Sequence, residues 1–122
     1  MWVVSMEKVQ KKQNDSMSTL RKRQSKFVRL VILLLMHIHA RGYEITFGDA
    51  YRDPRCKYGA PNSLHLMRLA IDLNLFKDGV YLTDTEDHRE FGEYWESLDP
   101  DCSWGGHFND GNHYSLAYMG RK

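Results

Sequence analysis

The dipeptide Asp78–Gly79 lies between two short runs of strand-like residues, and it is the strongest local constraint on the fold. Residues 69–76 alternate apolar and polar side chains in their second half, and residues 80–82 form the second run. An Asp-Gly pair between two such runs is typical of a tight β-hairpin turn. Antiparallel β-structure is therefore expected in the second half of the chain.

The most apolar stretch of the chain precedes this hairpin and has a helical period. Its apolar residues recur at steps of three and four from Phe27 to Ile38, and Gly42 follows as a stop signal. Residues 43–47 are β-branched and aromatic in character and predict a strand. Residues 49–62 contain two prolines and a glycine, and they predict a loop.

A second helix is expected after the hairpin. Thr83 and Glu86 are spaced as in a capping box, and Pro100 closes the segment. The apolar residues of this segment share one helical face: Phe91, Tyr94, Trp95 and Leu98. The tail becomes strand-like from His113 to Tyr118. The sequence therefore predicts an α+β fold, a single small domain with an antiparallel sheet and flanking helices.

The charges are unevenly distributed along the 122 residues. Residues 1–29 hold eight Lys or Arg and two acids, a net +6, whereas residues 30–122 hold nine and fourteen, a net −5. We interpret residues 1–24 as a basic arm, loosely ordered or partly helical, and residues 25–122 as the folded domain. A solvated arm is the main expectation, with contact to nucleic acid or an anionic envelope surface as the alternative. We expect a monomer without an obligate nucleic-acid partner.

Signals for secretion or membrane insertion are missing from the sequence. The unbroken apolar run Leu30–Met36 is far shorter than the roughly 20 residues that span a bilayer. A core helix is the main interpretation, with a non-cleaved amphipathic anchor as the alternative. We expect synthesis in the cytoplasm without a signal peptide, so a target outside the membrane would be reached only after release. Cys56 and Cys102 form one disulfide or none.

Two imidazoles and two carboxylates are spaced as in a metal site. His65 precedes Asp72 by seven residues, and Asp110 precedes His113 by three. Two imidazoles and one carboxylate suit a catalytic zinc, and a nearby second carboxylate suits a general base. Because an unpaired carboxylate in an apolar strand is costly, Asp72 is expected to have a metal or another cation beside it. The alternative cations are Arg52 and Arg68.

Three blocks of sequence resemble the M15 zinc peptidases of peptidoglycan. Residues 63–72, SLHLMRLAID, are similar to the signature S-x-H-x-x-G-x-A-x-D. Residues 104–114, WGGHFNDGNHY, resemble the second block, in which two glycines precede an acid-x-x-His-aromatic element. Tyr51–Arg52 matches the Tyr-Arg pair before the first ligand. The family includes D-Ala-D-Ala carboxypeptidases and dipeptidases, and the L-alanyl-D-glutamate endopeptidases of phage endolysins.

The resemblance implies a zinc site on the sheet, with His65, Asp72 and His113 as ligands. It implies that Asp110 is the general base, where many relatives have Glu. Arg52 would bind the substrate carbonyl or stabilise the oxyanion, a role that suits its permanent charge and planar guanidinium.

Other residues of the three blocks are candidates for substrate contact or for support of the site. Ser63 would support it through its hydroxyl, and Tyr51 stands beside Arg52. His107 is either a contact residue or part of a solvated loop, and Trp104 either lines the cleft or packs beneath it. Arg68 replaces the glycine of the signature, so the loop differs in its backbone or carries an extra cation.

The leading interpretation is a zinc peptidase that cleaves the peptide stem of peptidoglycan. L-Ala–D-Glu endopeptidase specificity is favoured, because the chain is small, lacks a signal peptide and has Asp110 as phage enzymes do. One alternative is a D,D-carboxypeptidase that releases terminal D-Ala. Another is a non-catalytic, zinc-stabilised domain that binds the cell wall or a partner. Manganese or cobalt would be accepted by the same ligands.

Overall fold

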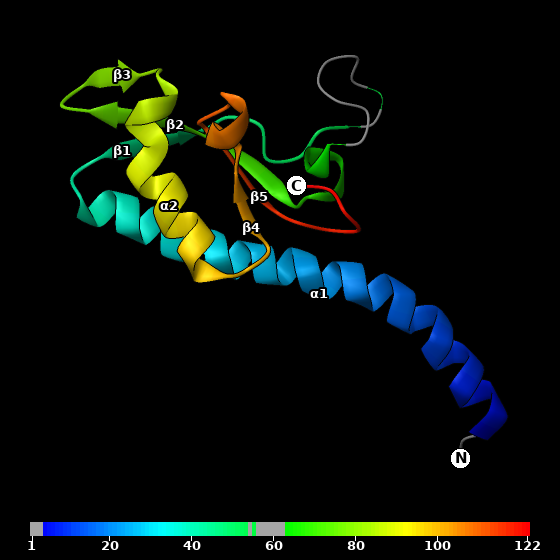
Figure 1. Cartoon of the computed structure of the whole chain (residues 1–122). Coiled ribbons are helices and arrows are strands. Elements are labelled where there is room, and N and C mark those ends of the chain that lie inside the picture. Colours follow the sequence, from blue (N-terminus) through cyan, green and yellow to red (C-terminus); the bar gives the residue numbers. More distant parts are fainter. Residues whose placement is uncertain (1–3, 54, 56–62) are drawn as a thin grey trace.

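A computed structural model describes residues 4–53, 55 and 63–122, and side chains from Thr19 onward within these ranges. Its two helices lie on one face of a five-stranded antiparallel sheet (Figure 1). The helices are α1 (Val4–Ala40) and α2 (Arg89–Leu98). The strands are β1 (Glu44–Phe47), β2 (Ala70–Lys77), β3 (Val80–Leu82), β4 (Cys102–Trp104) and β5 (His113–Leu116). The short 3-10 helices are η1 (Leu64–Met67), η2 (Thr85–His88) and η3 (Gly105–Phe108). The predicted α+β class is confirmed.

Strand β2 is the centre of the sheet. The strand order is β1-β2-β5-β4, and β3 pairs with the far end of β2. The predicted hairpin joins β2 and β3, and Asp78 and Gly79 both have positive φ angles of 50° and 78°. Positive φ at both central residues is the geometry that an Asp-Gly hairpin turn provides. The register of β2 and β5 sets Asp72 opposite His113.

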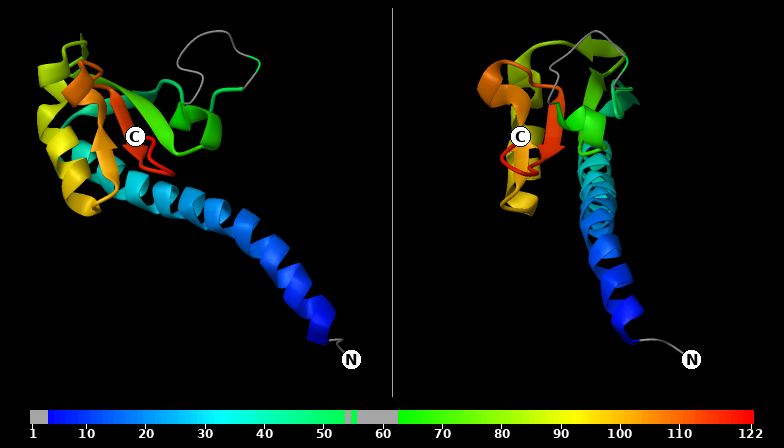
Figure 2. Two further views of the ribbon diagram at one scale, coloured as in Figure 1. Left: turned by 45° about the vertical axis from the view of Figure 1, so that its right-hand side comes forward. Right: turned by 90° about the vertical axis from the view of Figure 1, so that its right-hand side faces the viewer.

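Helix α1 begins well before the predicted helical period and continues without a break past residue 24. Its N-terminal part extends away from the sheet in both views of Figure 2. The predicted apolar face is buried: Phe27, Leu30, Val31, Leu34 and Ile38. The helix ends at Ala40, and Gly42 follows with a φ of 87°, as its position as a stop signal predicts. The boundary between arm and domain at residue 24 stays a prediction.

Helix α2 also has the predicted buried face, but the capping residue is shifted by one and α2 itself begins only at Arg89. The capping box is formed by Asp84 and Asp87, not by Thr83 and Glu86, and it opens η2 before α2. Asp shares the acceptor chemistry that makes Ser and Thr good N-caps. Asp84 has the extended backbone conformation of an N-cap, and the helical conformation of η2 begins at the next residue.

Strand β4 is absent from the sequence prediction. It spans only three residues and pairs with β5 in the register Trp104↔Tyr114. A run of three residues between Pro100 and two glycines is too short to display an alternating pattern.

The two faces of the sheet have different environments. Ile71, Leu73 and Leu75 on β2, and Tyr114 on β5, belong to the core beneath the helices. Because side chains alternate along a strand, Asp72 and His113 point to the opposite face. The fold therefore leaves the candidate metal ligands on the face that the helices do not cover.

Candidate metal centre

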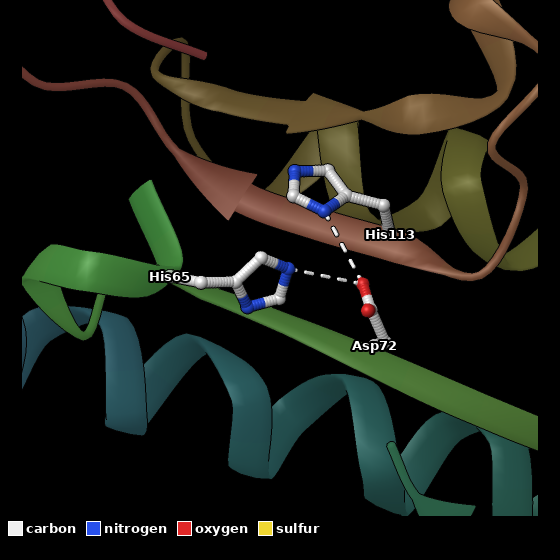
Figure 3. Close-up of side chains that lie close together, drawn as sticks. All are labelled: His65, Asp72 and His113. Carbon is white, nitrogen blue, oxygen red and sulfur yellow. Dashed lines mark hydrogen bonds and ion pairs between the residues drawn. The ribbon is translucent and has the colours of Figure 1, made fainter. Parts of the chain in front are cut away.

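His65, Asp72 and His113 converge on one point of the open sheet face (Figure 3). The Nε2 atom of His65 lies 3.2 Å from Oδ1 of Asp72, and Nδ1 of His113 lies 3.3 Å from the same oxygen. One donor atom from each residue lies within 4.8 Å of the others. The structure thus brings together the three residues that the sequence predicts as ligands.

Local backbone structure explains this convergence. Asp72 and His113 are cross-strand neighbours in the register of β2 and β5. His65 is on η1, whose N-cap Ser63 accepts a hydrogen bond from the His65 amide through its hydroxyl. Arg68 ends η1 with a φ of 59°, so the chain reverses into β2 and His65 faces back over the sheet.

The carboxyl group of Asp72 is held as an anion. Partial burial of Asp72 raises its pKa. Hydrogen bonds with His113 and His65, and the charges of these rings, outweigh this effect and lower the pKa to about 2. An ionised carboxylate and two imidazole nitrogens are a donor set that binds zinc. The buried Nδ1 of His65 has no hydrogen-bond partner among the described residues. The residues therefore fit a divalent ion of the zinc type.

A pocket of about 460 Å³ opens over these three side chains. Asp110 lines it beside them, and its side chain is exposed. The Asp110 backbone is fixed, because its N–H donates to the Gly105 carbonyl at 2.9 Å and its carbonyl accepts from the His113 N–H at 3.1 Å. The backbone of Asp110 is thus held at the edge of the candidate metal centre.

Two more predicted residues, Arg52 and Ser63, line the same pocket. The Arg52 side chain is buried, and its Nη2 lies 3.3 Å from Oδ2 of Asp49. Its amide donates to the His65 carbonyl at 3.1 Å, so the backbone that carries Arg52 is tied to η1.

Three predicted residues do not line the pocket. Tyr51 is exposed, and the Arg68 guanidinium lies 4.3 Å from the centre of its ring. Nε2 of His107 lies 2.9 Å from a carboxylate oxygen of Glu96 on α2. Trp104 is buried beneath the site, which decides between the two positions expected for it. Its Nε1 donates to the Gly111 carbonyl at 2.7 Å.

Five pocket-lining residues were not among the predicted ones: Ser103, Gly105, Phe108, Arg121 and Lys122. Ser103, Gly105 and Phe108 lie in or next to the second block, whereas the two cations follow it. Their positions depend on strand pairing and on the Tyr118–Arg121 bridge, and neither has a signal in the local sequence.

His88 and Cys102 are both buried. Only 3% of His88 is exposed, and its Nδ1 forms a 2.8 Å hydrogen bond with the Tyr114 hydroxyl. Cys102 is a free thiol, whose pKa burial raises to about 12. Cys56 lies outside the described residues.

Part of the chain matches a known family of peptidases. The model of an M15 peptidase family, described as D-alanyl-D-alanine carboxypeptidase, matches residues 57–116. This span contains the three candidate ligands and Asp110, whereas Tyr51 and Arg52 precede it. No curated protein matches the chain.

Proposed function

We propose that the chain, whose residues 57–116 match the model of an M15 peptidase family, hydrolyses a peptide bond in the peptide stem of bacterial peptidoglycan. The observation that carries the proposal is the convergence of two imidazoles and a carboxylate in a pocket that a second carboxylate also lines. All four residues lie in the segment that the family model matches.

His65, Asp72 and His113 would hold the metal, for which zinc is the proposed ion. When bound, zinc would supply a Lewis acid that polarises the scissile carbonyl and acidifies water. All three side chains line the same pocket. The negative charge of Asp72 would partly neutralise the ion and support its binding.

Asp110 would act as the general base. Its carboxylate would take a proton from the attacking water and pass it to the leaving amine. The hydrogen bonds of its backbone to Gly105 and His113 keep it at the pocket edge without using its side-chain oxygens. Arg52, from the Tyr51–Arg52 pair, also lines the pocket. It would stabilise the negative charge that develops on the carbonyl oxygen.

The pocket carries cations that suit an anionic substrate. Arg52, Arg121 and Lys122 line it together with the candidate ligands. The peptide stem has carboxylates, and both candidate scissile bonds, L-Ala–D-Glu and D-Ala–D-Ala, have one beside the amide. Attraction between these charges would orient the stem across the site.

We favour cleavage of the L-Ala–D-Glu bond, as in the phage endopeptidases, because Asp110 replaces the Glu of many relatives. The second candidate is release of terminal D-Ala, which the description of the matching family as a D-alanyl-D-alanine carboxypeptidase favours. Both reactions use the same residues in the same roles.

Mass spectrometry of the products released from purified peptidoglycan tests the proposal. Stem peptides that have lost L-Ala from their start would establish the endopeptidase, and loss of a terminal D-Ala would establish the carboxypeptidase. A chelated sample is the control for metal dependence. If zinc-loaded protein releases neither product from several wall types, the proposal is wrong.

The variant Asp110→Asn separates catalysis from metal binding. It is expected to bind zinc normally and to lose activity by about 10²- to 10⁴-fold, the usual contribution of a general base. The matched control is Asp78→Asn, because Asp78 lies on the distant hairpin turn and Asn tolerates its positive φ. Equal activity of both variants would exclude Asp110 as the base.

A further inference from the structure

Helix α1 has large apolar side chains on its outward face as well as on its core face. Four of them, with exposed fractions of 56%, 50%, 45% and 65%, form what we call the outer stripe: Val28, Ile32, Leu33 and Met36. Three of these residues follow one another at steps of four, so they lie along one line of the helix. Packing against the sheet does not require them, because a separate set of residues fills the core.

The edge strand β1 has a further exposed apolar side chain. Phe47 at its end is 66% exposed. A hollow of about 470 Å³ lies between α1 and β1, lined by Leu35, His39, Tyr43, Glu44, Ile45, Thr46 and Phe47. Exposed apolar side chains that gather on one helix face mark an interaction site more often than isolated ones do.

The same helix face is basic. Residues 16–43 contain no Asp or Glu. Three cations of this segment, Arg23, Lys26 and Arg41, form ion pairs with carboxylates of the domain. The other three are exposed and have no carboxylate partner among the described residues: Arg21, Lys22 and Arg29. The outer stripe is therefore flanked by unneutralised positive charge.

The apolar outer stripe and the positive charge around it together indicate which kind of partner this face binds. A second copy packed on this face would bring the same cations together, and Glu44, the acid that lines the adjoining hollow, could pair with only one of them. A nucleic acid would neutralise the cations but leave the outer stripe in water. An anionic lipid surface satisfies both, because the apolar side chains enter the acyl boundary and the cations contact the head groups.

We propose that the outer stripe of α1 binds the protein to the surface of an anionic membrane. The helix lies in the plane of the interface, since no helix in the described part of the chain is long and apolar enough to cross a bilayer. The inference does not depend on the reaction that the enzyme catalyses.

The fold then determines which way the pocket faces. In Figure 3, α1 (teal) runs on one side of β2, and the Asp72 side chain stands on the other. The outer stripe lies on the side of α1 that faces away from the core. A bound molecule would thus present its pocket away from the lipid, toward whatever polymer covers the membrane.

Sedimentation of the full chain with vesicles tests the proposal. The protein is expected to bind vesicles of mixed phosphatidylglycerol and phosphatidylcholine, to bind pure phosphatidylcholine much less, and to be released by salt. The double variant Ile32→Ser/Met36→Ser is expected to weaken binding at least about tenfold, because two half-exposed apolar side chains no longer enter the lipid. The substitutions are on the surface, so circular dichroism should show an unchanged fold.

The control is Phe108→Ser, which removes a 70% exposed apolar side chain from the pocket face and should bind vesicles like the wild type. Three results would overturn the proposal. The first is the absence of binding to anionic vesicles, and the second is binding that the Ile32→Ser/Met36→Ser variant retains in full. The third is a dimer, seen by light scattering without lipid, that the same variant abolishes.

Discussion

Replacing Gly92 by alanine tests how the helix layer supports the candidate metal centre. Gly92 lies on the buried side of α2, and a Cβ atom there would lie 2.1 Å from Cδ2 of Trp104. Gly106 packs against the other end of the same indole, where a Cβ atom would lie 2.2 Å from Cη2. Between them, the indole Nε1 donates to the Gly111 carbonyl, next to Asp110. The indole therefore links α2 to the loop that carries the proposed base.

The magnitude follows from two opposing effects. Alanine stabilises a helix interior by about 1 kcal/mol relative to glycine. The new methyl group, however, would be about 1.4 Å closer to the indole than the ~3.5 Å carbon–carbon optimum, because the present backbone leaves 2.1 Å. Overpacking of this kind costs about 1–3 kcal/mol, and a displaced indole loses a hydrogen bond worth about 1 kcal/mol. We expect Gly92→Ala to lower the free energy of unfolding by about 1–3 kcal/mol.

Urea unfolding of the metal-free protein measures this change. Glu93→Ala on the exposed side of α2 is the control, and its effect should stay within about 0.5 kcal/mol. In a Trp104→Ala background no ring atom lies beside the new methyl group, so Gly92→Ala should cost at least about 1 kcal/mol less than in the wild type. A Gly92→Ala protein that is more stable than the wild type would refute the close packing of Trp104 against Gly92.

Three further predictions concern the metal, the pH and the η1 turn. Zinc at about 100 times its dissociation constant should raise the free energy of unfolding by about 2.7 kcal/mol, and Asp72→Asn should remove most of this gain in a thermal melt. Burial lowers the pKa of His88 below 6.5, despite the opposing charge of Asp87, so the unfolded chain binds more protons than the folded one in acid. Stability should therefore fall as the pH drops below about 6.5, and His88→Gln should flatten that part of the urea-unfolding profile. Arg68→Gly should be about 1 kcal/mol more stable than Arg68→Ala, because only glycine adopts a φ of 59° without strain.

The elements that the sequence predicts correctly are those whose signals are local. The β2–β3 hairpin depends on two turn residues, and the buried faces of α1 and α2 depend on helical periodicity within each segment. Strand β4 and the burial of His88 depend on partners that are distant in sequence. The buried His88 contacts Tyr114, which lies 26 residues later in the chain. The residues next to His88 in the sequence do not predict that contact.

The same distinction applies to the site. The three candidate ligands and Asp110 are predictable because two short blocks carry them at characteristic spacings. Arg121 and Lys122 reach the pocket only because the chain folds back after β5, so their role in it has no local signal. Conversely, His107 stands inside a block but turns to Glu96, which shows that proximity in sequence does not place a side chain in the pocket.

Arg68 shows how a departure from a family signature is resolved by backbone geometry. The sequence left open whether an arginine in place of glycine changes the loop or adds a cation. The turn keeps a left-handed residue at this position, with the Arg68 N–H donating to the His65 carbonyl and the Leu69 N–H donating to the Leu64 carbonyl. The signature glycine thus meets a backbone requirement, which arginine also meets at a cost of about 1 kcal/mol. Because those two hydrogen bonds hold His65 over the sheet, the replacement affects stability while the geometry of the candidate ligands is retained.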